Sequence, residues 1–447
     1  MSPLELTQQV VALALAQGAT DAECTIAEGE EFSVSVRMGD IEKLQEATSR
    51  SAGLRVLVGQ RSGSAYTSDL TPEGIRRMVS SAVDNAEVTG EDPFSGLPER
   101  EDLGQIVGDL NLFDESIGSL TAPEKIEQAR RAEAAFLAYD PRIDKSEGAS
   151  YDSGISGRYF ANSRGFAGGY RSSQCSLSAV PVASQDGAME RDYWYSSARS
   201  PRKLDTPENI GIIAAKRTLR RLGARKVATQ KAAIVFEPRM ARMLLSHIGD
   251  AVDGDSVYRD SSFLAGKLGE RVASENVTIV DDGTMPGLWG SSPFDAEGVP
   301  TRRKMVIEKG ILKSYLLNTY TARKLGLKTT GNAGRGLSGA AYVQNGNFYL
   351  EPGSLTPEEV IRQAGTGLYV TEVLGNGVNI VNGDYSCGAQ GLWIENGELA
   401  YPVSEVTIAS TLMEMLNSIE AIGSDLEFQS TMAAPTLMIR EMTISGN

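Results

Sequence analysis

Histidine, the side chain that most often serves as a catalytic base or metal ligand, occurs once in this chain of 447 residues, as His247. It lies in residues 237–252, where Pro238 suits an early helical position and apolar residues recur at helical spacing, so we predict a helix that Gly254 closes. A histidine on a helix beside acidic residues suggests a zinc metalloprotease, in which two imidazoles hold the metal and a glutamate activates water. One imidazole cannot build that site. We therefore interpret His247 as a polar residue near a helix end.

Acidic residues after this helix suggest a weaker kind of metal chemistry. Asp250, Asp253 and Asp255 lie close together around a glycine, but they do not meet the 12-residue calcium pattern. We interpret them as a solvated helix end. Asp281-Asp282-Gly283 is predicted to be a turn, because Asp bonds to nearby backbone and Gly allows positive φ.

A glycine-rich segment matches the pattern of dinucleotide-binding loops. Residues 334–339 read GRGLSG, which is GxGxxG. That fingerprint requires a strand before it, a helix after it and an acidic residue about 20 positions on. The surrounding residues indicate a mobile loop instead. We leave two interpretations open: a flexible flap over a peptide channel, or a plain surface loop.

Four helices are expected to begin with the same local chemistry. A capping hydroxyl, a proline in the first helical turn and a carboxylate near the positive end of the helix dipole stand together. The pattern predicts helices over 72–87, 207–222, 356–364 and, in a looser form, 123–138. The threonines in question are Thr71, Thr206, Thr356 and Thr121. A further amphipathic helix is expected over residues 4–17.

The chain exceeds the length at which a single core usually stops growing, so we expect several domains. The predicted fold class is α+β: N-terminal α/β modules are followed by a large β-rich C-terminal domain. The predicted boundaries are 1–90 for an N-terminal α/β module, 91–120 for a linker, 121–224 for a central α+β module and 225–447 for the C-terminal domain. Short strands are expected at 22–26, 31–37, 51–58, 62–66, 157–162 and 172–182 in the first half, and at 232–236, 277–280, 368–371, 392–395 and 407–410 in the second. A hairpin that turns at Lys309-Gly310 is expected over 305–312.

Composition limits the partners and the compartment. The formal net charge of −15 argues against binding nucleic acid through phosphates, which requires clustered lysine and arginine. No apolar run approaches the roughly 20 residues of a membrane span, and the first residues do not resemble a signal peptide. The three cysteines are few and far apart, which fits a reducing compartment without structural disulfides. We expect a cytoplasmic protein that binds neither nucleic acid nor membrane.

Several short motifs, dense between about 230 and 423, resemble the TldD/PmbA family, formerly called modulators of DNA gyrase. The resemblance extends over essentially the whole chain. The motifs are Gly254-Asp255, Ser261-Ser262-Phe263, Leu268-Gly269-Glu270, Val280-Asp281-Asp282-Gly283-Thr284, Glu297-Gly298-Val299-Pro300-Thr301, Gly310-Ile311-Leu312, Thr330-Gly331-Asn332, Gly383-Asp384-Tyr385-Ser386 and Ile394-Glu395-Asn396-Gly397-Glu398.

The helix around His247 distinguishes the two branches of that family. The TldD branch carries the zinc motif HExxxH shortly before Gly-Asp. Counted back from Gly254-Asp255, its three functional positions fall on Leu245, Ser246 and Asp250. Leucine has no donor atom, serine is a poor ligand, and one aspartate cannot hold Zn²⁺ alone. The chain therefore resembles the PmbA branch, also called TldE, and we expect neither a metal site nor a cofactor in it.

The same resemblance bears on Cys387, because the TldD branch has a cysteine ligand in this region. Counted back from Ile394-Glu395, that ligand position falls on Gly388, and a one-residue slip in a strand turns the side chain to the opposite face. A nucleophilic thiol would also need a base, and His247 is distant in sequence. We interpret Cys387 as an inert small residue, with a channel contact or a catalytic role as alternatives.

The resemblance implies a pseudoenzyme subunit. It would form a heterodimer with a TldD-like, HExxxH-bearing subunit that holds the zinc, and peptides or unfolded proteins would be cleaved inside a shared chamber. The expected peptide-channel residues of this chain are Ser386, Cys387, Gly388 and Arg335. Two alternatives remain: a homo-oligomeric peptide-binding or scaffold protein with no protease role, and an independent hydrolase that uses Cys387.

Overall fold

The protein is described by a computed structural model of residues 1–106 and 108–446. Its first half is built on one seven-stranded sheet with the strand order β3-β2-β1-β4-β5-β6, in which β7 also pairs with β5. Segments 1–90 and 121–224 therefore share a sheet, because β1 pairs with β4. The strands are β1 (Asp21–Arg37), β2 (Asp40–Val58), β3 (Arg61–Thr67), β4 (Ile143–Asn162), β5 (Ala167–Gln185), β6 (Ala188–Arg191) and β7 (Trp194–Ala198).

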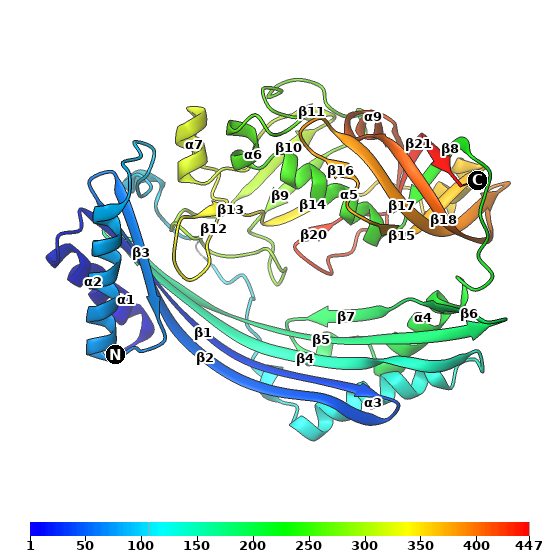
Figure 1. The fold of residues 1–447 in the computed structure, drawn as a ribbon, viewed down its shortest axis with the longest axis horizontal. Coiled ribbons are helices and arrows are strands. Elements are labelled where there is room, and N and C mark those ends of the chain that lie inside the picture. Colours follow the sequence, from blue (N-terminus) through cyan, green and yellow to red (C-terminus); the bar gives the residue numbers. More distant parts are fainter. Residues whose placement is uncertain (107, 447) are drawn as a thin grey trace.

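Helices cover one face of this sheet, which we call the outer face. Along β1, the buried residues Cys24 and Ile26 lie in a core with the first two helices, and Val34 and Val36 lie in a core with the next two. This alternation turns the intervening residues to the inner face. Figure 1 shows the long strands passing beneath the C-terminal part, which covers the inner face. The helices are α1 (Pro3–Ala16), α2 (Pro72–Val88), α3 (Ala122–Leu137) and α4 (Pro207–Leu219).

The C-terminal part contains a closed ring of strands and a second, smaller sheet. The ring closes because β15 pairs with both β8 and β17. Its strands are β8 (Gln230–Phe236), β15 (Gly367–Leu374), β17 (Asp384–Glu395), β18 (Glu398–Thr411) and β21 (Leu437–Ser445), with β16 (Val378–Asn379) and β19 (Ile419–Ile422) attached. The smaller sheet is β11-β10-β9-β14-β20: Ile311–Leu312, Arg303–Glu308, Ile279–Asp282, Asn347–Leu350 and Met432–Ala433.

Five helices and a short hairpin complete this part. Helix α5 packs its buried face, including Leu244 and Ile248, into the core that the ring and the smaller sheet share. Helix α5 spans Pro238–Ala251. The other helices are α6 (Gly254–Tyr258), α7 (Thr319–Leu325), α8 (Pro357–Ala364) and α9 (Leu412–Asn417). The hairpin consists of β12 (Ala333–Gly334) and β13 (Tyr342–Val343). None of the helices formed by the described residues combines the length and apolar composition that a membrane crossing requires.

The predicted α+β class is confirmed, with 39% of residues in strands and 25% in helices. The four predicted helix starts are also confirmed. Thr71, Thr206 and Thr356 each accept a hydrogen bond from a backbone N–H in the first turn, and a proline opens each helix. At the looser start, Glu124 accepts hydrogen bonds from the backbone and hydroxyl of Thr121.

Three local predictions are corrected by the structure. The predicted short strands of the first half are parts of strands up to 20 residues long. Gly254 does not close the helix at His247, because α5 ends at Ala251 and Gly254 begins α6, which Asp253 caps. The turn predicted over Asp281-Asp282-Gly283 begins only at Gly283, because Asp281 and Asp282 end strand β9 and are buried against β10 and β14. Asp282 does make the predicted local bond, accepting from the Thr284 N–H at 2.8 Å.

Candidate functional site

Helix α5 carries the three positions at which the family resemblance would place zinc-site residues. Leu245 is 4% exposed and belongs to the core, and the Ser246 hydroxyl donates to the Met243 carbonyl at 2.7 Å. Asp250, in contrast, is exposed. Five residues turn an α-helix by roughly 140°, so Leu245 and Asp250 face different sides. Zn²⁺ requires several nitrogen, sulfur or oxygen donors that converge, and these residues do not fit that requirement.

His247 lies near Tyr385 and Asp250 rather than in a metal site. Its ring meets the Tyr385 ring edge-on at 6.3 Å between centroids. Burial lowers the pKa of His247, and the Asp250 charge opposes that shift only in part. The imidazole is therefore neutral at pH 7. In the part of the chain that the structure describes, no group of three His, Cys, Asp or Glu side chains is arranged to hold a metal.

Cys387 lies on β17 with its side chain in the core. It is 2% exposed, beside the equally buried Tyr385. Burial raises the pKa of the Cys387 thiol, so the thiol is protonated at neutral pH and is a weak nucleophile. Ser386 and Gly388 alternate with it and face the opposite side of the strand, and Ser386 is exposed. The structure thus separates Cys387 from the other two residues predicted beside it.

Ion pairs hold α5 over the sheet. Glu237, directly before the helix, accepts from Arg217 at 2.7 Å and from Arg220 at 3.1 Å. Arg217 lies in the last turn of α4, and Arg220 directly follows that helix. On the next turn, Arg242 donates to the Tyr195 hydroxyl of β7 at 3.3 Å and to the Ser430 hydroxyl at 3.1 Å. These contacts fix the position of α5 relative to the inner face of the sheet.

A cavity of about 600 Å³ separates the inner face of the sheet from the C-terminal part; we call it the interlayer cavity. Its volume is in the range of small-molecule and peptide side-chain sites. Its roof consists of Trp289, Gln429, Ser430 and Thr431. Its floor includes Glu31, Ser33, Asp152, Gln174, Ser176 and Ser197, from four different strands.

Short hydroxyl side chains stand in register on the floor of the interlayer cavity, on both sides of Asp152. Ser33 of β1 is opposite Asp152 of β4, which is opposite Ser176 of β5, which is opposite Ser197 of β7. The next row contains Ser35, Ser150 and Ser178. A serine hydroxyl can both donate and accept, so this surface can bind peptide N–H and C=O groups alike. Small side chains also leave the room that creates the cavity.

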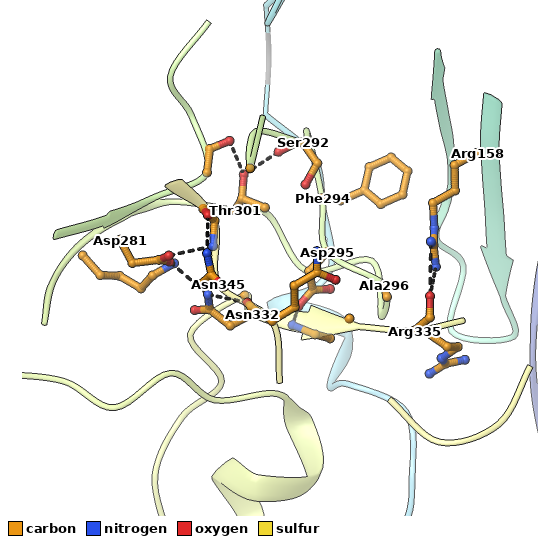
Figure 2. A pocket seen from close by; sticks show the side chains of 18 of the residues that line it. Arg158, Asp281, Ser292, Phe294, Asp295, Ala296, Thr301, Asn332, Arg335 and Asn345 are labelled. Atoms are coloured by element: carbon orange, nitrogen blue, oxygen red, sulfur yellow. Dashed lines mark hydrogen bonds and ion pairs between the residues drawn. The ribbon is translucent and has the colours of Figure 1, made fainter. Parts of the chain in front are cut away.

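A second, smaller pocket of about 120 Å³ lies between the sheet and the loops of the C-terminal part (Figure 2). Asp281 at its edge is bound by Lys304 at 2.9 Å and by Asn332 at 2.9 Å. Asp295 accepts from the backbone N–H groups of Glu297, Val299 and Ala333. Burial and then the Glu297 carboxylate raise the pKa of Asp295, while those three N–H groups oppose the shift. The acids of this pocket are satisfied by the protein itself.

Arg335, predicted as a channel residue in a loop, borders this second pocket but is anchored between the layers. Its backbone carbonyl accepts from Arg158 of β4 at 3.4 Å (Figure 2), and its side chain is 2% exposed. The guanidinium lies 2.6 Å from Glu23 of β1, which Arg55 of β2 also binds at 2.7 Å. Burial disfavours the Glu23 carboxylate, but the two arginines outweigh it and hold the pKa of Glu23 below its ordinary value.

The sequence did not identify the interlayer cavity or the Glu23–Arg335 pair. A signal for the cavity was present, because Ser176 and Ser178 alternate with apolar residues along a predicted strand. Alternation shows that a face is polar, but not that a second layer covers it. The residues of the roof come from loops whose position depends on the whole fold.

Models of three consecutive domains match the chain. They are domain 1 of the PmbA/TldA metallopeptidases over residues 22–86, their central domain over 115–222 and their C-terminal domain over 229–446. The metalloprotease PmbA of Escherichia coli O157:H7 is 41% identical, and the match covers 97% of this chain and 94% of that protein. A PmbA homologue of Haemophilus influenzae is 37% identical, over 99% of this chain and 96% of its own length.

Solved structures share the fold over its full length. A crystal structure from Bacteroides thetaiotaomicron, named for modulation of DNA gyrase, superposes with a TM-score of 0.93 at 30% identity, covering 99% of this chain and 98% of the other. TldE from Thermococcus kodakarensis gives a TM-score of 0.89 at 21% identity, covering 99% and 100%, and that likeness concerns the fold alone.

Proposed function

Because the chain belongs to the PmbA/TldD family of metallopeptidases, we propose that it is the subunit without a zinc site in a two-subunit protease. The partner would be a TldD-like chain with the HExxxH motif, which supplies the zinc and the catalytic residues. This chain would contribute a wall of the chamber in which peptides or unfolded proteins are bound. No catalytic step is assigned to its own residues.

The observation that carries the proposal is the chemistry of α5. The helix is present where the family places its zinc motif, but its residues cannot form the site. Leu245 has no donor atom and is buried in the core, and Asp250 faces another side of the helix. The neutral His247 and the protonated Cys387 do not replace them.

Two further features support a peptide-binding role in a reducing compartment. The interlayer cavity presents hydroxyls in register, and hydroxyls bind the main chain of an extended peptide whatever its sequence. The three cysteines, Cys24, Cys175 and Cys387, are all free and buried. We therefore place the proposed complex in the cytoplasm, where thiols stay reduced.

A zinc-binding and activity measurement on the purified chain alone tests its part of the proposal. We expect isothermal titration calorimetry to detect no stoichiometric Zn²⁺ binding, and we expect no cleavage of an unstructured polypeptide in the presence of zinc. Stoichiometric zinc together with unaided cleavage would contradict the proposal. If Cys387→Ala then abolished that cleavage, the chain would be an independent hydrolase.

A further inference from the structure

Two carboxylates line the interlayer cavity without a cationic partner. They are Glu31 of β1 and Asp152 of β4. Within residues 1–106 and 108–446, no hydrogen bond or ion pair reaches either side chain. Two other acids of β1 are paired, by contrast: Glu23 binds two arginines, and Glu28 binds Arg50 at 2.7 Å. The two cavity carboxylates are therefore available to a ligand.

The strand register brings these two carboxylates together. Glu31 is opposite Gly154, and Asp152 is opposite Ser33, so Glu31 and Asp152 are diagonal neighbours on one face, with Cα atoms roughly 7–8 Å apart. Gly154 leaves open the space between the stems of Glu31 and Gln174, whose Cγ atoms are 3.8 and 3.9 Å from where a Cβ would be. Two like charges that share one hollow repel each other unless a cation lies near them.

The rest of the lining does not supply that cation. No lysine or arginine is among the described residues that line the interlayer cavity. Two cations beside the lining donate to hydroxyls instead: Lys125 to Ser153 at 3.0 Å and Arg242 to Ser430 at 3.1 Å. Arg199 lies behind the roof, 4.7 Å from the Trp289 ring centroid, and donates to the carbonyls of Gly287 and Leu288. Its charge is thus engaged at the back of the roof. The remaining lining is uncharged and consists of hydroxyls, the amides of Gln174 and Gln429, and the side chains of Phe32, Cys175 and Trp289.

We propose that the interlayer cavity binds extended polypeptide segments that carry lysine or arginine, with the cationic side chain held by Glu31 and Asp152. The serine hydroxyls of the floor, such as Ser176, would bind the main chain. This inference rests on the proposed function for the class of substrate and adds a selection by charge to it. The selection belongs to this chain, away from the partner's zinc.

The test measures peptide binding to this chain alone, by fluorescence anisotropy, without zinc and without the HExxxH-bearing paralogue that we propose as its partner. Three labelled, unstructured peptides of equal length carry lysine, glutamine or glutamate at the same positions. We expect the lysine peptide to bind best. Glu31→Gln/Asp152→Asn should weaken its binding about tenfold, which corresponds to about 1.4 kcal/mol, and should leave the glutamine peptide unchanged.

A matched variant separates the local effect from bulk charge. Asp84→Asn/Glu398→Gln also removes two negative charges, on exposed positions of α2 and β18, so both variants change the formal net charge from −15 to −13. We expect less than a twofold change for this control. Because the cavity variant removes a repulsive pair, it should unfold no earlier than the wild type on heating.

A third variant locates the binding site. Ser176→Trp should fill the floor and weaken all three peptides alike. Equal affinities for the lysine and glutamate peptides, equal losses in both double variants, or unchanged binding by Ser176→Trp would each overturn the inference. None of these results depends on the paralogue, so stimulation of its peptidase can succeed or fail independently.

Discussion

A buried ion pair between single residues connects the long sheet to the C-terminal part. The buried Glu23 is bound by Arg335 from the C-terminal part and by Arg55 from the sheet. Such a pair is costly to break, because the remaining charge stays buried without compensation. The same chemistry at Glu237 and Arg217 joins α5 to α4. These ion pairs hold the C-terminal part over the sheet, and these two parts form the walls of the interlayer cavity.

Removal of one member of the Glu23–Arg335 pair should destabilise the protein strongly. For Arg335→Met we expect a loss of about 2–4 kcal/mol in the free energy of unfolding, measured by urea denaturation, since Arg55 still partly compensates Glu23. Glu23→Gln/Arg335→Met should recover at least half of the loss. Arg131→Met breaks the exposed pair with Glu208 and should cost less than about 1 kcal/mol. Equal costs for the buried and exposed pairs would contradict this account.

Asp253, the cap of α6, predicts a dependence of stability on pH. Burial raises its pKa to about 6, above the roughly 3.9 of an unfolded chain. The folded protein therefore retains a proton that the unfolded chain releases, so this contribution to stability is complete below about pH 4 and is lost as the pH rises through 6.

Asp253→Asn keeps the cap but removes the titration. Relative to the wild type, its free energy of unfolding should rise by roughly 1–2 kcal/mol between pH 4 and pH 7, after allowance for partial exposure to solvent. Urea denaturation at both pH values measures the difference, with Asp84→Asn on α2 as the control. A difference that does not change with pH would show that Asp253 is ordinarily solvated.

At the scale of elements, local signals predicted the helices well and placed the strands correctly but made many of them too short. Caps such as Thr71-Pro72-Glu73 act within one turn of chain, so the sequence shows them directly. Residues 40–50 of β2 are exposed on both faces and mostly polar, and they lack the alternation that indicates a strand. They are a strand because they pair with β1, which is a tertiary effect.

The candidate site was likewise predictable only where the local sequence determines it. The position of residues 245–250 on a helix, and their lack of zinc ligands, followed from sequence. The burial of Arg335 did not, because its partner Glu23 lies in the opposite half of the chain. The interlayer cavity likewise exists only once β1, β4, β5 and the roof loops are assembled.

The docking of the 335–339 loop on β2 gives a prediction at the level of elements. A Cβ on Gly53 would lie 1.7 Å from the Leu337 carbonyl oxygen, so only glycine permits the contact. Gly53→Ala should cost about 2 kcal/mol in urea denaturation and should speed tryptic cleavage after Arg335. A Cβ on Gly29 would meet only the Ser49 hydroxyl, at 3.0 Å, so Gly29→Ala should change stability by less than about 1 kcal/mol. Unchanged cleavage in Gly53→Ala would contradict the docking.

At the scale of the whole molecule, the two halves form opposite walls of one cavity. Helices cover the outer face of the long sheet, and the C-terminal part lies over its inner face (Figure 1). Hydroxyls of that inner face line the interlayer cavity. Helix α5, at the position of the family's zinc motif, packs Leu244, Leu245 and Ile248 into the core. This arrangement is the reason for our proposal that the chain binds an extended peptide and that a partner subunit cleaves it.

The most direct test of that assignment is a titration of this chain into its HExxxH-bearing paralogue with zinc present. Cleavage of a fluorogenic, unstructured polypeptide is the measured rate. We predict no cleavage by this chain alone and a rate that rises above that of the paralogue alone until the two chains are equimolar. A rate that this chain never raises, or cleavage by this chain without the paralogue, would contradict the account.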